Sequence, residues 1–301
     1  MPELPDLTVY IEALDARVRG DTLASATIVS PFVLRTVDPP MAALAGRTVT
    51  GLRRLGKRIV IEFGMDFLVI HLMVAGRLQW HATPPKANRR LMLALFTFSR
   101  GTLVLTEASK KKRASIHLVS GPQALEPFGR GGLEPLDISE RQFAERVRSE
   151  NHTIKRTLTD PHLFAGIGNA YSDEILHRAR LSPLLLTSRI SDAEITRLFT
   201  AIRDSLAEWT TRLRTELGGG WPAKVTAFRD EMAVHGKFGK PCPDCGAPVQ
   251  RIRYADNETN YCVTCQTGGK LLADRGLSRL LKTDWPRNLD ELDELMPGNG
   301  G

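Results

Sequence analysis

The spacing of hydrophobic positions changes along the chain and divides it into regions. In the first twenty residues, apolar side chains recur at helical intervals, at Leu7, Ile11, Leu14 and Val18. This spacing predicts one amphipathic helix ending near Gly20. From about residue 24 to 120 the pattern is that of short strands rich in β-branched and aromatic residues, as in RIVIEF, DFLVIHLMV, RLMLALFTF and TLVLTEA. Residues 1–125 are therefore expected to form a β-sandwich or flattened barrel with one helix at its start.

Helical patterns dominate the middle of the chain. The Pro- and Gly-rich segment LEPFGRGGLEPLD predicts a linker over residues 126–137. Two capping-box patterns, Ser139 with Gln142 and Ser191 with Glu194, predict helix starts. Between them, IKRTLTDPHLFAGIGNAYSDEIL predicts a helix, a glycine-containing turn and a second helix. We assign residues 138–235 to a helical domain, in which GGGWP ends the helical block and begins a loop.

Four cysteines distinguish the C-terminal region from the helical region before it. Cys242 and Cys245 form one pair, Cys262 and Cys265 form another, and sixteen residues separate the pairs. This spacing predicts a tetrahedral Zn²⁺ site in which four thiolates leave no open position, so the metal would be structural. The alternative is four reduced cysteines without metal. The segments VQRIRY and TNY on either side of an ADNE turn predict a two-stranded hairpin. The fold class is thus α+β multidomain, with a zinc finger over 236–267 and a tail over 268–301.

The net charge and the hydropathy of the chain indicate its kind of partner and its cellular compartment. The net charge is +7 and the pI is near 9.4, which favours a polyanionic partner. No apolar run approaches the roughly 20 residues needed to span a bilayer. Asp6, Glu12 and Asp15 lie where a secretory signal would be apolar. These features predict a cytosolic protein that does not associate with membranes.

Several polar residues are candidates for nucleic-acid contacts. In GIGNAY, the glycines allow a tight turn, Asn169 stands where a helix N-cap is expected, and the helix N-terminus would attract an anion. Lys155 precedes this turn by one helix and could reach the same phosphate. The alternative is an ordinary helix–turn–helix packing unit. The basic run that contains Lys110 and Lys111 is either a DNA contact or a solvated loop, and Lys57 in GKRIV is either functional or a surface lysine.

The opening hexapeptide, MPELPD, is the last candidate. If the initiator Met is removed, Pro2 presents a secondary amine that can attack a sugar C1′ and form an iminium. Glu3 could then move protons in the same pocket. The alternative is a helix that merely begins with proline.

Taken in order, MPELPD, GKRIVIEF, HLMVAGRL, the helix–turn–helix segment and the paired cysteines resemble the formamidopyrimidine-DNA glycosylase/endonuclease VIII family, and its formamidopyrimidine branch in particular. The resemblance covers roughly residues 1–267. It implies a monomeric base-excision-repair enzyme that acts on damaged double-stranded DNA, excises oxidised or ring-opened bases, and nicks the strand by β,δ-elimination. It further implies a flipped-out target nucleotide.

The resemblance also implies a role for each candidate residue. Pro2 would be the nucleophile, Glu3 the acid/base at the opening sugar ring, and Lys57 a cation near the lesion and its phosphate. Lys155 and Asn169 would contact backbone phosphates. Cys242, Cys245, Cys262 and Cys265 would hold one structural zinc.

This chain departs from the family pattern at two places, and these departures limit which functional roles the resemblance implies. At the hairpin position where the family usually has a phosphate-binding arginine, this chain has Asn257, so we expect the hairpin to contribute less to affinity. The family's HLGMSG is here HLMVAG, with Met73 displaced by one, and no aromatic residue follows in TEASKKKRAS. The residues that fill the gap left by a flipped base must therefore differ. Alternative functions are an AP lyase, a glycosylase for oxidised pyrimidines or bulky adducts, or a catalytically silent binder of damaged DNA.

Overall fold

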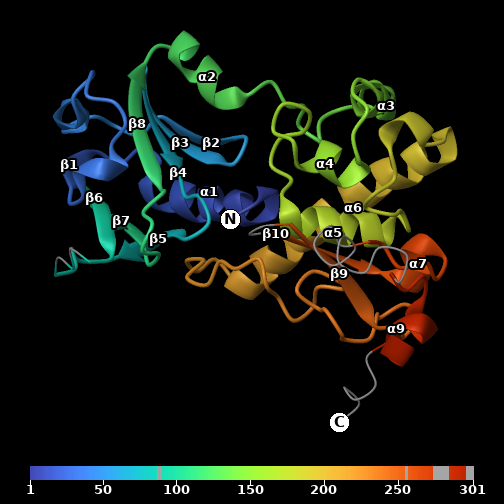
Figure 1. Cartoon of the computed structure of the whole chain (residues 1–301). Coiled ribbons are helices and arrows are strands. Elements are labelled where there is room, and N and C mark those ends of the chain that lie inside the picture. The colour runs from blue at the N-terminus through green and yellow to red at the C-terminus, as the bar shows by residue number, and fades with distance from the viewer. Residues whose placement is uncertain (87, 89, 255–256, 274–284, 296–301) are drawn as a thin grey trace. The chain divides into compact units, whose positions relative to one another are not determined.

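The computed structural model describes residues 1–86, 88, 90–254, 257–273 and 285–295 (Figure 1). Residues 1–132 together with 207–227 form one compact unit, and residues 133–206 with 228–301 form the other. Among the helices in the described ranges, none is long and apolar enough to cross a membrane.

The first unit is a sandwich of two antiparallel four-stranded sheets with a helix at its start. The helix α1 spans Leu4–Val18, which confirms the predicted amphipathic helix. The first sheet has the order β1-β6-β7-β5 and the second has the order β2-β3-β4-β8. The strands are β1 Leu23–Ile28, β2 Gly51–Leu55, β3 Arg58–Phe63, β4 Asp66–His71, β5 Gly76–His81, β6 Met92–Phe98, β7 Gly101–Glu107 and β8 Ser115–Ser120.

One hydrophobic core joins the two sheets and α1. Alternate residues of β3 and β6, such as Ile59, Ile61 and Phe96, are fully buried in it with Leu7 and Tyr10 of α1. The opposite face of β3 and β4 is covered by the 3₁₀ turn η3 (Pro122–Leu125) and the short helix α2 (Glu126–Gly129). The segment predicted as a linker therefore begins with a helical turn. Short 3₁₀ turns also occur at η1 (Pro31–Val33) and η2 (Met41–Leu44).

The apolar run predicted as one strand ends earlier than expected. Strand β4 ends at His71, and the chain turns between Leu72 and Gly76 before β5 begins. Met73 adopts a left-handed backbone conformation with φ 52°, which a continuous strand does not allow. Gly76 is required for the turn, because a Cβ at that position would lie 2.3 Å from the Leu72 carbonyl oxygen. The prediction of strand over residues 72–74 is wrong for this reason.

The second unit contains the helical region and the cysteine hairpin, which we define as residues 242–265. Its helices are α3 (Glu140–Arg148), α4 (Ile154–Thr159) and α5 (Asn169–Arg178), with η4 (Thr187–Arg189) after them. Helix α6 (Asp192–Leu217) passes from this unit into the first, and its end at Leu217 precedes GGGWP as predicted. The capping boxes at Ser139 and Ser191 are both formed.

Strands β9 (Val249–Tyr254) and β10 (Asn257–Cys262) pair antiparallel and confirm the predicted hairpin. The helix α7 (Val263–Thr267) follows, and β10 packs against α5 (Figure 1). Further along, α9 (Leu289–Leu295) places Leu289 and Leu292 against the apolar cluster of the hairpin. In the tail, the pattern of LLADRGLSRLLK predicts a helix, and most of this stretch lies outside the described residues.

Candidate functional site

The chain's N-terminus is built into the start of α1. Glu3 is the N-cap residue of this helix and forms a capping box with Asp6, whose carboxylate accepts the Glu3 N–H at 3.0 Å. Pro2 is buried, and Glu3 is only 3% exposed. A carboxylate at a helix N-terminus is favoured by the helix dipole, so the fold can keep Glu3 buried. The hexapeptide therefore holds its carboxylate in a fixed place beside the chain terminus.

Charges of both signs surround the terminal amine. Burial lowers the pKa of the α-amino group of Met1, Glu3 and Asp6 oppose this change, and Arg77 and Lys57 add to it. Lys57 lies in the turn between β2 and β3, and burial lowers the pKa of its ammonium while Glu3 opposes that shift. The terminus, Glu3 and Lys57 thus share one electrostatic environment. An amine whose pKa is lowered is more often unprotonated and nucleophilic at neutral pH.

A group of basic residues lies around the end of β4, and sequence reasoning selected only Lys57 from it. Burial, followed by the charges of Arg58, Lys57 and Arg130, lowers the pKa of His71 from 6.5 to about 4. His71 is therefore neutral at pH 7 and can offer an N–H without a charge. The only sequence signal was a histidine that interrupts an apolar run.

The turn that follows β4 presents an apolar side chain. Val74 is 60% exposed, whereas its neighbour Met73 is half-buried. The Arg77 guanidinium donates hydrogen bonds to the carbonyl oxygens of Val74 (3.0 Å) and Gly76 (2.7 Å) and holds the turn in shape. The exposed apolar residue at this turn is thus Val74, not the Met73 that the sequence singled out.

The basic run forms a loop after β7 that a buried glutamate organises. The carboxylate of Glu107 accepts the N–H of Arg113 (2.9 Å) and of Ala114 (3.1 Å) and the Ser109 hydroxyl (3.2 Å). Lys110 and Lys111 are exposed at the outside of the loop. The loop is therefore a fixed turn that carries two solvated cations, an arrangement suited to phosphate.

In the helical region, the ammonium of Lys155 is engaged within the protein. It donates to the Asn169 carbonyl oxygen (3.1 Å), the Ser172 hydroxyl (3.0 Å) and the Asp173 carboxylate (2.5 Å). The structure thus brings Lys155 and the start of α5 together, as the sequence predicted. The predicted N-cap role of Asn169 is wrong: Gly168 is the N-cap residue, and the Asn169 amide donates to the Glu258 carbonyl oxygen of β10 at 2.7 Å.

Asp173 and Glu174 of α5 extend these contacts toward the cysteine hairpin. Asp173 Oδ2 accepts from His235 Nδ1 (2.8 Å) and from the Asn260 N–H (3.2 Å). The Glu174 carboxylate accepts three successive backbone N–H groups, those of residues 233, 234 and 235, at 2.8–2.9 Å. Sequence reasoning missed both carboxylates. Together they fix the segment that leads into the hairpin onto α5.

The four cysteines meet as a Zn²⁺ site requires. Their sulfur atoms all lie within 4.8 Å of one another, with Cys245–Cys262 at 3.4 Å and Cys242–Cys265 at 4.0 Å. Zn–S bonds of about 2.3 Å in a tetrahedron give S···S separations of about 3.8 Å. Burial raises the pKa of the Cys262 thiol to about 11 and also raises that of Cys265, so a cation is needed to hold them as thiolates. The residues therefore fit one structural zinc.

Asn257 is exposed at the start of β10, next to residues 255 and 256, which lie outside the described ranges. Two arginines lie on β9, the strand paired with β10. Both pair with Glu258: Arg251 at 3.4 Å and Arg253 at 3.6 Å. The positive charge on this part of the hairpin is thus partly balanced by Glu258.

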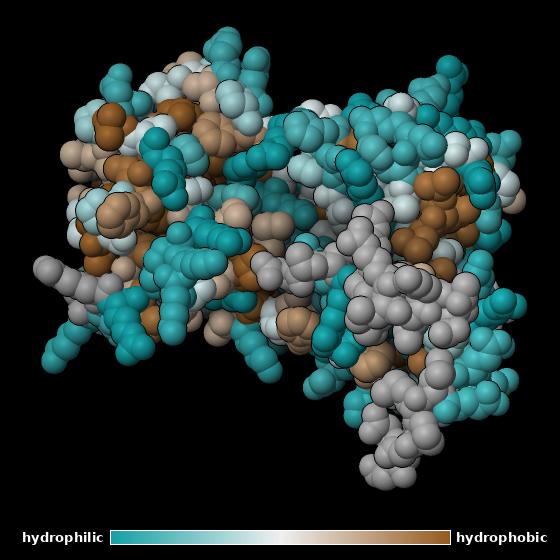
Figure 2. Space-filling view, in the orientation of Figure 1, coloured by the Kyte–Doolittle hydropathy of each residue, from teal (hydrophilic) through white to brown (hydrophobic). Residues whose placement is uncertain are grey.

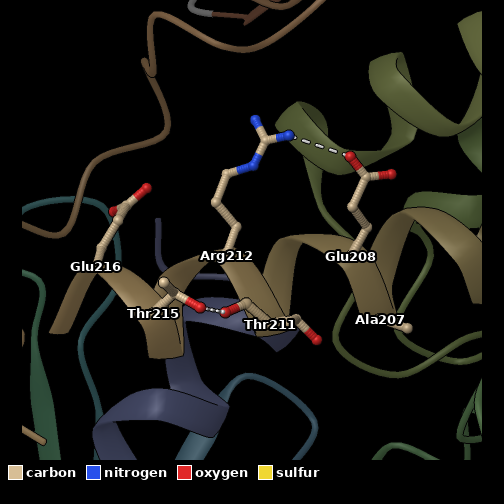
Figure 3. A pocket seen from close by; sticks show the side chains of 6 residues that line it. All are labelled: Ala207, Glu208, Thr211, Arg212, Thr215 and Glu216. Carbon is tan, nitrogen blue, oxygen red and sulfur yellow. Dashed lines mark hydrogen bonds and ion pairs between the residues drawn. The ribbon is translucent and has the colours of Figure 1, made fainter. Parts of the chain in front are cut away.

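Surface shape alone does not locate the site. Hydrophilic residues cover most of the face in Figure 2, with small apolar patches among them. A shallow hollow of about 570 Å³ lies along α6 (Figure 3), lined by Ala207, Glu208, Thr211, Arg212, Thr215 and Glu216. In it, Arg212 and Glu208 form an exposed ion pair at 3.1 Å. None of the predicted site residues lines this hollow.

Comparison with known families matches three successive parts of the chain. Residues 1–113 match the formamidopyrimidine-DNA glycosylase N-terminal domain, and residues 132–213 match the formamidopyrimidine-DNA glycosylase H2TH domain. Residues 239–268 match a zinc finger found in FPG and IleRS.

Relatives cover most of the chain. A formamidopyrimidine-DNA glycosylase from Pelotomaculum thermopropionicum is 31% identical over 279 residues, which cover 88% of this chain and 99% of that protein. An uncharacterised formamidopyrimidine-DNA glycosylase-like protein from Mycobacterium tuberculosis is 42% identical over 151 residues, or 50% of this chain and 94% of the relative. The complex of Lactococcus lactis Fpg with DNA containing an abasic site has a TM-score of 0.76 at 28% identity, covering 88% of this chain and 99% of that one.

Proposed function

Since the chain belongs to the formamidopyrimidine-DNA glycosylase family, we propose that it is a base-excision-repair glycosylase that removes damaged bases from double-stranded DNA and then nicks the strand. The proposed place of action is the cytoplasm, at the nucleoid, and the proposed acting form is a monomer. One structural zinc would be held by the cysteine hairpin, where it stabilises the fold and takes no part in bond breaking.

The observation that carries the proposal is the shared environment of the chain terminus, Glu3 and Lys57. After removal of Met1, the nitrogen of Pro2 would attack C1′ with its lone pair, and the glycosidic bond would break with its electrons leaving on the base, which takes up a proton. Glu3, held in place by the capping box, would protonate the sugar ring oxygen as the ring opens to the iminium. Lys57 would stabilise the negative charge of the adjacent phosphate.

Strand cleavage follows from the same iminium. Loss of a proton from C2′ expels the 3′ phosphate, and a second elimination expels the 5′ phosphate. The iminium acts as the electron sink in both steps, so no further cofactor is required. Flipping of the target nucleotide would expose C1′ for this attack.

Binding of the duplex would use residues of both units. In the first unit, the exposed Lys110 and Lys111 and the neutral His71 would donate to phosphate oxygens, and the exposed Val74 would be the apolar side chain that enters the base stack. In the second unit, the Asn169 amide retains a second N–H for a phosphate, since only one is used by Glu258. The exposed apolar residue and the loop after β7 both depart from the family pattern, so lesion preference is a matter for direct assay.

Borohydride trapping tests this function directly. Reduction of the iminium would give a covalent protein–DNA adduct with a duplex carrying a damaged base or an abasic site. We expect Pro2→Gly to reduce the adduct strongly, and Glu3→Gln to abolish base excision while leaving DNA binding intact. Pro5→Ala is the matched control because it changes a proline in the same segment without touching the terminal amine.

The outcomes separate the alternatives. A silent binder of damaged DNA would give no adduct with any substrate. An AP lyase would trap on abasic DNA alone, and a panel of oxidised purines, oxidised pyrimidines and bulky adducts would identify a different glycosylase. Mass spectrometry showing an intact or blocked Met1 in the active protein would refute the role of Pro2.

A further inference from the structure

Helix α5 presents a row of polar side chains to the cysteine hairpin and to the segment that leads into it. The row begins at Asn169 and continues four, five and eight residues later with Asp173, Glu174 and His177. Residues at this spacing lie on one side of a helix. The first three contact the backbone of residues 233–235 and of β10, as described above. His177 is the fourth member of this row, and its partner is a cysteine.

The His177 imidazole lies against the proposed metal centre. Its Nε2 atom is 3.2 Å from the sulfur of Cys242, a distance suited to an N–H···S hydrogen bond. His177 is 4% exposed and Cys242 is 2% exposed, so water cannot replace this contact easily. The nearest carboxylate oxygen, in Asp244, is 4.0 Å from the same nitrogen. Of these two groups, only the sulfur of Cys242 therefore lies within hydrogen-bond distance of the His177 Nε2 atom.

We propose that His177 donates its Nε2–H to the Cys242 thiolate and thereby sets how tightly the protein holds zinc. A donor to a ligating sulfur disperses the negative charge of the four thiolates and fixes the direction of the sulfur toward the metal. His177 lies on α5, well before the hairpin in the chain, so the zinc centre is fastened to the helix whose first residue is Asn169. This inference concerns retention of the metal and does not depend on the proposed catalytic role of Pro2.

Zinc affinity, measured on the full-length protein by competition with a chromophoric chelator, tests the proposal. His177→Asn and His177→Gln form a matched pair, because both are polar amides but only the glutamine places a donor near the position of Nε2. We expect His177→Asn to bind zinc about 10–100-fold more weakly than the wild type, the usual effect of removing a partner of a metal ligand. His177→Gln should recover most of that loss, and Asp244→Asn should change the affinity far less than His177→Asn.

A spectroscopic measurement gives an independent readout. In the protein loaded with Co²⁺, loss of the hydrogen bond should move the thiolate-to-metal charge-transfer band to longer wavelength, since the sulfur electrons become less stabilised. The band should shift in His177→Asn and stay near the wild-type position in His177→Gln. Wild-type affinity and an unmoved band in His177→Asn would overturn the proposal. Equal weakening by the asparagine and the glutamine would also overturn it, because packing alone would then explain the effect.

Discussion

Removing the charge of Asp173 should destabilise the second unit strongly. Its carboxylate is 0% exposed at the side chain and forms an ion pair with Lys155 at 2.5 Å, and it also accepts hydrogen bonds from His235 and the Asn260 N–H. The Lys155 side chain is itself only 11% exposed. Asp173→Asn would thus leave an ammonium in the protein interior without a counter-charge.

The size of the effect follows from the energetics of buried ion pairs. Breaking such a pair by removing one partner costs about 3–5 kcal/mol, because the remaining charge is desolvated and unpaired. For a unit of this size each kcal/mol lowers the melting temperature by about 2–4 °C, so we expect a fall of about 6–20 °C in the unfolding of this unit. Replacing both partners with apolar side chains, as in Lys155→Met with Asp173→Leu, should recover the part of the loss that comes from the unpaired ammonium, whereas His235 and the Asn260 N–H would still lack this acceptor.

Differential scanning calorimetry at saturating zinc measures these shifts, and hydrogen exchange at residues 233–235 and in β10 locates them. The comparison is a double-mutant cycle of Asp173→Leu, Lys155→Met and the pair. A melting temperature of Asp173→Asn within about 2 °C of the wild type would refute the reasoning. So would a double variant no more stable than Asp173→Leu, since the buried charge would then not be the source of the loss.

Three further predictions concern the first unit. The pKa of His71 is about 4 in the folded state and 6.5 in the unfolded state, so its contribution to stability is present above pH 6.5 and is lost as the pH falls toward 4. In urea unfolding, the free energy of unfolding of the wild type should therefore fall by about 2 kcal/mol more than that of His71→Gln over this pH range. Equal losses in the two proteins would contradict the lowered pKa of His71. Glu107→Gln should loosen the loop that follows β7, so that trypsin cleaves faster after Lys110 and Lys111; unchanged cleavage would mean that Glu107 does not hold the loop. Replacing Lys110 and Lys111 with alanine should weaken the salt dependence of DNA binding. The slope of log affinity against log salt should become smaller by about 0.9 for each DNA phosphate that the protein no longer neutralises. An unaltered slope would show that neither lysine contacts DNA.

The strands that the sequence predicted are the central strands of the two sheets. RIVIEF, TLVLTEA and the centres of the other two named segments correspond to β3, β7, β4 and β6. Strands β1, β2, β5 and β8, the outer strands of the two sheets, were not named individually. Each has only one or two buried residues among exposed or half-exposed ones, and such short patterns are hard to distinguish from loop. The sequence therefore predicted the sandwich but not its outer strands.

The same contrast holds for the site. The paired cysteines have a spacing that predicts a metal site, and their sulfur atoms do come together. Lys155 contacts the start of α5, as the helix–turn–helix segment predicts. Asp173 lies within that segment and His177 directly follows it, but nothing in the segment indicates their partners. Their partners, His235 and Cys242, lie 62 and 65 residues away along the chain, so only the folded structure brings them together.

Met73 has a consequence for the encounter with DNA. A methionine in the left-handed region is held there at a cost of about 1–2 kcal/mol, which glycine would not incur. Glycine would, however, give this bend many more conformations in the free protein. Methionine at this position restricts the backbone more than glycine would, and the hydrogen bonds of Arg77 to the Val74 and Gly76 carbonyl oxygens add to that restriction in the protein without DNA. If Val74 enters the base stack as proposed, less conformational freedom is given up on binding, so association should be faster and less costly in entropy than with a loop that must first become ordered.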